Sequence, residues 1–166
     1  MRTFQESLNL THKPTALIEE FLSQQPEHIN LINVEKHQPH FKMGDLIWET
    51  TQGVKAVEVK IQTTHYTSLF LETRSNVERN TPGFMATSQA DLFINYSTHS
   101  GSGIIIPFKA LFNWLAQNLQ KLPTRQARTR VGVEYYTSEG RIAPLEALAL
   151  IPGARVFYKP LVEIPV

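Results

Sequence analysis

The clearest β-strand in the sequence is VKAVEVKI, residues 54–61. Valine and isoleucine favour strands, and side chains two apart on a strand point to the same face. Glu58 and Lys60 therefore share one face, while the intervening valines and Ile61 are expected to face the core on the other. An acid and an amine in so apolar a strand are costly to bury unless they pair or serve a site.

The segment before this strand completes a predicted β-hairpin. Residues 45–50 are expected to form a strand with Asp45 at its start, and a turn follows at 51–53. Paired strands lie about 4.8 Å apart, so the hairpin brings the Asp45 carboxylate towards Glu58. Two convergent carboxylates suit Mg²⁺ or Mn²⁺, and a lysine beside them helps to position a water and neutralise a transition state of phosphate. The competing interpretation is a surface hairpin in which Glu58 and Lys60 pair without a metal.

Helices and strands are expected on both sides of the hairpin. Those upstream are an irregular arm at 1–12, a helix from Pro14 to about residue 25, a strand at 29–35 and a polar loop at 36–43. Those downstream are a strand at 68–72, an irregular stretch at 73–86, strands at 92–96 and 104–106, a helix from Pro107 to before Pro123, a strand at 130–136, a short helix near 143–149 and a proline-rich extended end. This order predicts an α/β or α+β domain with a mixed sheet.

Length and composition limit the classes of protein. A chain of 166 residues corresponds to about one domain of roughly 100–200 residues, so we expect a single domain over 1–166. With 42% hydrophobic and 19% charged residues the chain is globular in composition, and without cysteine it has no disulfide, thiolate zinc site or cysteine nucleophile. No apolar run approaches the roughly 18–20 residues of a membrane span, and the first residues lack the features of a signal peptide. We therefore expect a cytoplasmic protein with no membrane association.

The order Gly44-Asp45, turn, Glu58-Val59-Lys60 resembles the PD-(D/E)xK nuclease superfamily, which includes restriction enzymes and Holliday-junction resolvases. Downstream segments are similar to a group of phage and bacterial members, namely LFLE at 69–72, TPGF at 81–84 and ADLF at 90–93. The resemblance covers a core of about residues 14–120 and leaves 121–166 as an unmatched C-terminal extension. It departs from the family name at Gly44, where that name has proline.

This resemblance implies a restriction-endonuclease-like α/β fold, a mixed β-sheet flanked by helices. It implies that Asp45 and Glu58 are metal ligands and that Lys60 is the catalytic lysine of an Mg²⁺-dependent DNA endonuclease, with Mn²⁺ as a substitute. A Holliday-junction-resolvase-like action is one form of this activity, and cuts in both strands would need a homodimer. The first alternative is a catalytically inactive nucleic-acid-binding module of the same fold. The second is an interaction protein whose hairpin charges are structural.

Three further acids are candidates for a supporting role. Glu72, on the next expected strand, either joins the site or faces solvent at a strand end. Relatives of the resolvase type use a glutamate of the first helix as an additional ligand, which points to Glu19 or Glu20. A solvated charge is the simpler interpretation of either residue.

Positive charge gathers between Asp91 and Glu134, where no acidic residue occurs although the net charge of the chain is only +1. The basic residues there are Lys109, Lys121, Arg125, Arg128 and Arg130. They either meet the phosphates of a nucleic acid or belong to an ordinary solvated loop after a helix.

Overall fold

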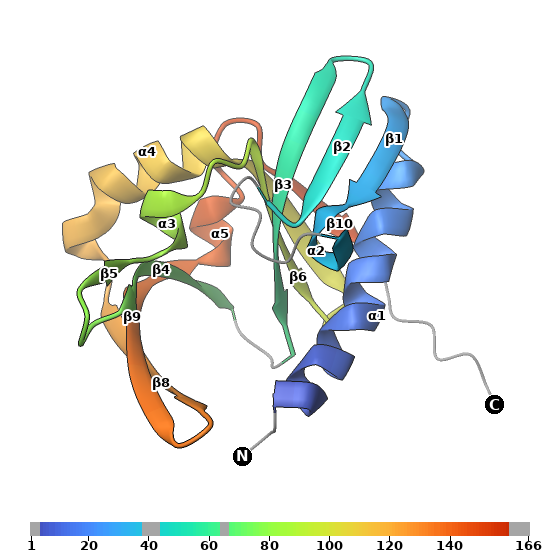
Figure 1. Cartoon of the computed structure of the whole chain (residues 1–166). Coiled ribbons are helices and arrows are strands. Elements are labelled where there is room, and N and C mark those ends of the chain that lie inside the picture. Colours follow the sequence, from blue (N-terminus) through green and yellow to red (C-terminus); the bar gives the residue numbers. More distant parts are fainter. Residues whose placement is uncertain (1–3, 38–43, 64–66, 160–166) are drawn as a thin grey trace.

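The computed structural model describes residues 4–37, 44–63 and 67–159 (Figure 1). The helices are α1 (Phe4–Ser23), α2 (Val34–His37), α3 (Phe84–Thr87), α4 (Phe108–Asn118) and α5 (Leu145–Leu148), with the 3-10 helix η1 (Leu119–Lys121). The strands are β1 (His28–Asn33), β2 (Leu46–Thr50), β3 (Gly53–Gln62), β4 (Ser68–Asn76), β5 (Thr81–Pro82), β6 (Leu92–Ser97), β7 (Ser102–Pro107), β8 (Thr124–Val131), β9 (Glu134–Pro144) and β10 (Arg155–Tyr158).

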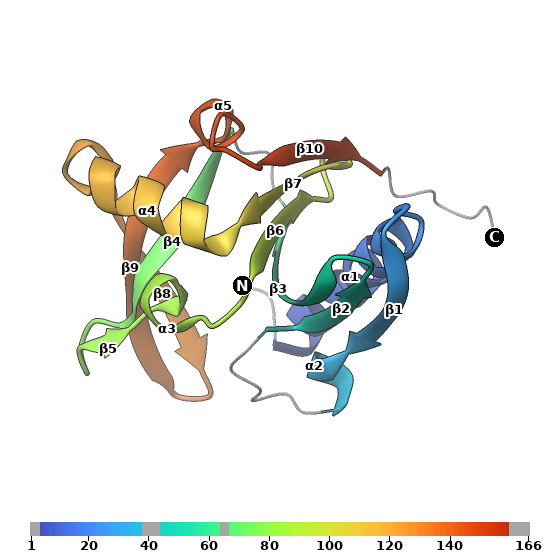
Figure 2. The same ribbon diagram turned by 90° about the horizontal axis from the view of Figure 1, so that it is seen from above.

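The strands of these described segments form two sheets. Sheet A has six strands in the order β1-β2-β3-β6-β7-β10, and sheet B has four in the order β5-β4-β9-β8. β3 pairs antiparallel with β2 and parallel with β6, so sheet A is mixed. Helices lie on both of its faces (Figure 2). The predicted α/β class, a mixed sheet flanked by helices, is confirmed.

One face of sheet A curves around α1 (Figure 2). Ile18 and Leu22 of α1 are buried against Trp48, Val57 and other apolar side chains of β2, β3, β6 and β7. Ile18 and Leu22 lie four residues apart, on the same side of a helix. This explains how an amphipathic helix covers the face of β3 that carries the valines.

The opposite face of sheet A meets sheet B, α4 and α5. Leu71 of β4, Phe93 of β6 and Leu111 of α4 are buried together in this second core. Sheet B lies on the side of β3 that carries Glu58 and Lys60, since Glu72 of β4 interacts electrostatically with both residues. Residues 124–158 contribute to both sheets, since β8 and β9 complete sheet B and β10 pairs with β7.

Helix α1 starts earlier than the sequence predicted. It begins at Phe4, so the irregular arm expected at 1–12 is wrong for residues 4–12. Pro14 lies inside the helix although its ring nitrogen lacks the N–H that would bond back one turn. The proline is buried, and Ile18 and Leu22 further along the same helix pack against sheet A. Residues 1–3 lie outside the described part of the chain.

Two other predictions about secondary structure are also wrong. The strand expected at 130–136 is the tip of a hairpin, because Gly132 adopts a positive φ of 62° and turns the chain between β8 and β9. The stretch at 73–86, expected to be irregular, contains the end of β4, then β5 and α3. Pairing of β4 with the distant β9 extends this strand beyond residue 72. The expected loop residues 38–43 and the proline-rich end from 160 lie outside the described residues.

No helix in the described ranges has both the length and the apolar character needed to cross a membrane.

Candidate functional site

Glu58 and Lys60 form an ion pair on β3, with 3.0 Å between Lys60 Nζ and Glu58 Oε1. The Glu58 side chain is 15% exposed and that of Lys60 is 45% exposed. On the other face of the strand, Val57 is fully buried, and Val59 and Ile61 pack against the core beneath α1. The two-faced pattern predicted for this strand is confirmed, and it sets both charged groups on the side that faces sheet B.

Asp45 is tied to β3 by its main chain and by its side chain. Its N–H donates to the Val57 carbonyl at 2.8 Å, and its Oδ2 accepts the Val59 N–H at 2.7 Å. Its own carbonyl accepts the N–H groups of Val34 and Glu35 from the start of α2. The carboxylate is therefore held at the level of β3 that lies between Glu58 and Lys60, as the predicted hairpin requires.

Gly44 allows this close approach. It is buried with a φ of 149°, and a Cβ at this position would lie 2.7 Å from the carbonyl oxygen of Val57. Proline is excluded as well, because its ring fixes φ near about −65°. The glycine at position 44 thus has a physical reason in this chain, which is to let Asp45 reach β3.

The pKa of Asp45 is raised from 3.8 to about 6, and burial is the largest cause. The negative charge of Glu58 contributes to this rise, while the Val59 N–H and the charge of Lys60 act against it. Glu35, near the carboxylate, also raises it. The ionised form of Asp45 is disfavoured beside Glu58, so a cation bound there would stabilise it.

The pKa of Lys60 is raised above 10.5 even though burial of the amine acts to lower it. Glu58 is the largest favourable influence, through its charge and its hydrogen bond, and Asp45 and Glu72 add to it. Burial raises the pKa of Glu72, with Lys60 and the Phe84 N–H opposing that change. Glu72 therefore belongs to the same electrostatic cluster, and Lys60 is an ammonium at neutral pH.

Phe84, at the start of α3, completes the surroundings of Lys60. The ammonium lies 4.9 Å from the centre of the Phe84 ring, within the range of a cation–π contact. The ring also stacks on Phe93 at 5.8 Å between centres. The family resemblance included Phe84 in the segment TPGF at 81–84, but nothing in the sequence indicated that its ring contacts Lys60.

A cleft of about 250 Å³ opens at the edge of β3 beside Asp45. It is lined by Thr15, Glu35, Asp45, Val59, Lys60 and Ile61. The sequence reasoning did not select Glu35, which α2 carries to the cleft from the end of the first strand.

The main chain of β3 offers this cleft a further oxygen. The N–H and C=O of one strand residue point to the same side, and the Val59 N–H meets Asp45 there. β2 starts at Leu46, opposite Val57, so no residue of β2 lies opposite Val59. The Val59 carbonyl therefore points to the edge that Asp45 occupies.

These donors fit one kind of metal. Within residues 4–37, 44–63 and 67–159, no three His, Cys, Asp or Glu side chains gather closely enough to hold a metal ion by themselves. Mg²⁺ is usually bound by one or two carboxylates and keeps several waters, which substrate phosphates replace in part. Asp45, Glu58 and the Val59 carbonyl are oxygen donors of that type, whereas a closed zinc site would need four protein ligands.

The other predicted residues lie elsewhere. Glu20 pairs with Lys159 at 3.3 Å, and Glu19 accepts a hydrogen bond from Asn33 at 2.8 Å. Their helix, α1, covers the face of sheet A opposite to that of Glu58 and Lys60. Arg125, Arg128 and Arg130 stand on β8, and Lys109 is in the first turn of α4. The solvated loop considered for the three arginines is therefore a strand.

Comparisons with models of known protein families, with curated proteins and with solved structures find no match for this chain.

Proposed function

We propose that this chain is a metal-dependent DNA endonuclease that hydrolyses phosphodiester bonds. One observation carries the proposal: the Asp45 carboxylate and the Glu58–Lys60 ion pair meet at one edge of β3. The order and types of these residues are those of the PD-(D/E)xK nucleases, and a mixed sheet between helices is compatible with a restriction-endonuclease-like fold. Asp45, Glu58 and the Val59 carbonyl are the proposed Mg²⁺ ligands, with Mn²⁺ as a substitute.

The bound cation would supply a Lewis acid that draws charge from the phosphate. Water attacks phosphorus and the bond to one bridging oxygen breaks, which leaves a phosphate monoester and a hydroxyl group. The protein's part is to hold the scissile phosphate and the attacking water in line. The 2.7 Å bond from Val59 to Asp45 fixes one ligand for this purpose.

Lys60 acts in the proposal as a cation rather than as a base. Its raised pKa keeps the amine protonated at neutral pH, so it has no free electron pair for a proton. Instead it donates hydrogen bonds to the phosphate oxygens as negative charge develops on them. Glu72 and the Phe84 ring are positioning groups that keep the ammonium on the Glu58 side of the cleft.

A cleavage panel tests the proposal. Linear, nicked, flap and four-way DNA substrates are incubated with the protein and Mg²⁺, Mn²⁺ or EDTA. We expect cleavage with either metal, none in EDTA, and loss of cleavage in Lys60→Ala. Cleavage of four-way DNA above the other substrates supports a resolvase-like action, and paired cuts with dimeric protein support a homodimer. A wild-type protein that cuts no substrate with either metal contradicts the proposal.

The second candidate is a nucleic-acid-binding module that has lost cleavage. The observation in its favour is that Glu58 and Lys60 already satisfy each other at 3.0 Å, as a purely structural pair would. DNA binding that weakens with salt, together with no metal-dependent cleavage, supports this candidate over the enzyme.

A further inference from the structure

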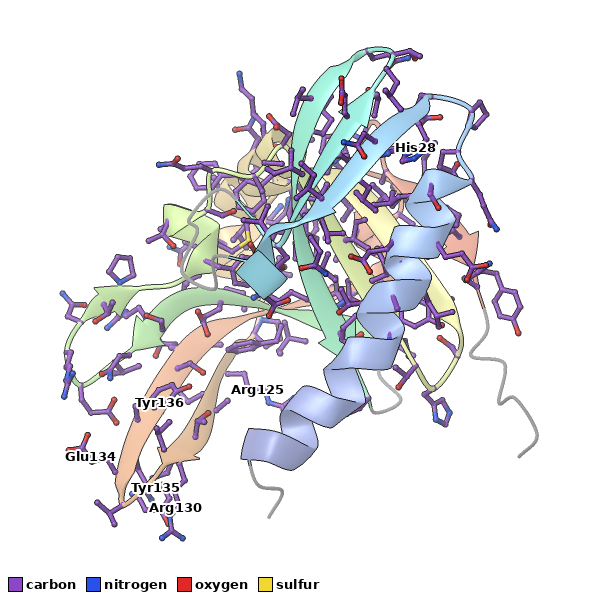
Figure 3. The ribbon with its side chains drawn as sticks, turned by 45° about the vertical axis from the view of Figure 1, so that its right-hand side comes forward. His28, Arg125, Arg130, Glu134, Tyr135 and Tyr136 are labelled. Atoms are coloured by element: carbon purple, nitrogen blue, oxygen red, sulfur yellow. The ribbon has the colours of Figure 1, made fainter. Side chains whose placement is uncertain are left out.

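β8 and β9 form a ribbon that projects from the body of the molecule (Figure 3). This β8–β9 arm comprises residues 124–137. All eight residues of β8 are exposed, and β8 is the edge strand of sheet B. At Thr137 the arm is braced, because Glu78 accepts hydrogen bonds from both the hydroxyl and the N–H of Thr137 at 2.6 and 3.0 Å.

Beyond this brace, little of the arm is buried. Val131 and Val133 at the turn are 62% and 88% exposed. A two-stranded ribbon by itself is only marginally stable in water. A protein that keeps such an element exposed, with apolar side chains at its tip, has a surface suited to insertion into a partner.

The charge of the arm identifies the chemistry of that partner. Its charged residues are three arginines and one glutamate, Arg125, Arg128, Arg130 and Glu134. The guanidinium carbons of Arg128 and Arg130 lie 4.5 and 5.7 Å from the centre of the Tyr135 ring. This contact holds both cations on one face, while Arg125 lies on the other face because strand side chains alternate. Cations on both faces of a ribbon complement a groove that has phosphates on both walls.

The arm is connected to the candidate site through sheet B. Glu72, Gly140 and Arg125 are successive partners across β4, β9 and β8. Directly opposed residues share a face, so Arg125 lies about 10 Å from Glu72 between Cα atoms, on the same side of the sheet. A cleft of about 220 Å³ there is lined by Arg125 together with Gln62, which is two residues beyond Lys60 on the same face of β3.

We infer that the β8–β9 arm is a ribbon that enters the major groove of double-stranded DNA. The part of the arm beyond Arg128 is about 10–13 Å long. It matches a groove about 8.5 Å deep and about 12 Å wide, which admits a two-stranded ribbon. The arm binds the phosphates of duplex DNA. One DNA strand then runs along the Arg125 cleft towards Lys60, and this second part of the inference rests on the proposed function.

Duplex binding in EDTA tests the arm without cleavage. Arg128→Ala/Arg130→Ala is compared with the wild type, with the charge-keeping Arg128→Lys/Arg130→Lys and with Lys55→Ala. Lys55 is the control, because it lies near the start of β3, whereas Gln62, which lines the Arg125 cleft, lies at the end of that strand. The exposed arginines contribute nothing to the core, so the alanine variant is expected to keep the wild-type melting temperature.

We expect duplex to bind more tightly than either single strand. The alanine variant loses about tenfold in affinity, and the slope of log affinity against log salt concentration falls by about 2. The lysine variant stays within a few-fold of wild type, and Lys55→Ala leaves the slope nearly unchanged. Equal duplex affinities for the alanine variant and the wild type overturn the inference. The inference is also overturned if the arm binds anionic phospholipid vesicles while the arginine variants bind DNA as tightly as the wild type.

The two proposals fail separately. Duplex binding that depends on the arm, together with no cleavage in Mg²⁺ or Mn²⁺, supports the role of the arm and contradicts the nuclease proposal. Cleavage that depends on Lys60, together with normal duplex binding by the arm variant, supports the nuclease proposal and contradicts the role of the arm.

Discussion

The Asp45 carboxylate accepts the main-chain N–H of Val59, the residue between Glu58 and Lys60, at 2.7 Å. This bond holds the first acid of the cluster at the strand that carries the other two groups. It uses Oδ2, and a carboxylate has a second oxygen to offer a cation. The site is therefore preorganised by the hairpin itself, and changes to Asp45 or its neighbours have distinct expected results.

Asp45→Asn should change how stability depends on pH. The pKa of Asp45 is about 6 in the folded chain and near 3.8 when unfolded. Between these values the folded state binds more protons, so the free energy of unfolding of the wild type falls as pH rises, by about 1–3 kcal/mol in total. Asparagine does not titrate, and it can still accept the Val59 N–H.

Urea denaturation in EDTA at about pH 4.5 and about pH 7.5 measures this difference. The Asp45→Asn variant should be the more stable protein at the higher pH, and its advantage over the wild type should be smaller at the lower pH. A difference between the two proteins that does not vary with pH contradicts the assigned environment of Asp45.

Lys60→Ala should lower the rate of cleavage by about 100-fold or more, because it removes a cation from the developing negative charge. The Lys60 side chain is 45% exposed, so loss of its ion pair should cost less than about 1 kcal/mol in stability. Mn²⁺ binding, followed by calorimetry, should persist. Lys55→Ala removes a lysine from the same strand away from the cluster, and equal cleavage rates for the two variants would count against the role of Lys60.

Gly44→Ala should destabilise the chain more than Gly53→Ala. Both glycines have positive φ, at 149° and 117°, but a Cβ at Gly53 meets no atom within 4 Å. Each alanine therefore carries a backbone cost of about 1–2 kcal/mol, and only that at position 44 must also displace Val57. Thermal melting of both variants measures the difference in stability. Because Gly44 lies so close to β3, Gly44→Ala should have the lower melting temperature, and equal melting temperatures would contradict this account.

Phe84→Leu should reduce cleavage by about 2–5-fold, the worth of an exposed cation–π contact. Leucine keeps the position apolar and retains much of its packing near Phe93. Phe112→Leu, at an exposed position of α4, is the control and should cleave at the wild-type rate. An unchanged rate in both variants would show that the ring does not position Lys60.

The hairpin was predictable because its signals are local. Alternation within 54–61, the turn at 51–53 and Asp45 at the strand start determine the faces and pairing that the structure has. The role of Gly44 could not be predicted from the sequence, since glycine is needed there because of a contact with the Val57 backbone 13 positions later. Phe84 and Glu35 reach the cluster through short helices, α3 and α2, which lack the length that makes a periodic pattern visible.

Sheet B could not be predicted because its pairings are distant in the chain. β4 lies beside β9, so Glu72 is opposite Gly140, and neither sequence segment signals the other. Likewise, α1 runs from Phe4 to Ser23 with Pro14 inside it, although a proline favours the first turn of a helix. The basic cluster was visible as composition, but its arrangement on both faces of an exposed ribbon follows only from the β8–β9 register.

Relaxation of supercoiled plasmid tests the central claim most directly, since a single cut changes the mobility of the whole molecule. The wild type, with Mg²⁺ or Mn²⁺, is predicted to nick the plasmid, while EDTA, Asp45→Asn and Glu58→Gln each abolish nicking. Nicking that persists in EDTA or in both carboxylate variants would contradict a metal-dependent site at Asp45 and Glu58, as would a wild-type protein that leaves the plasmid intact with both metals.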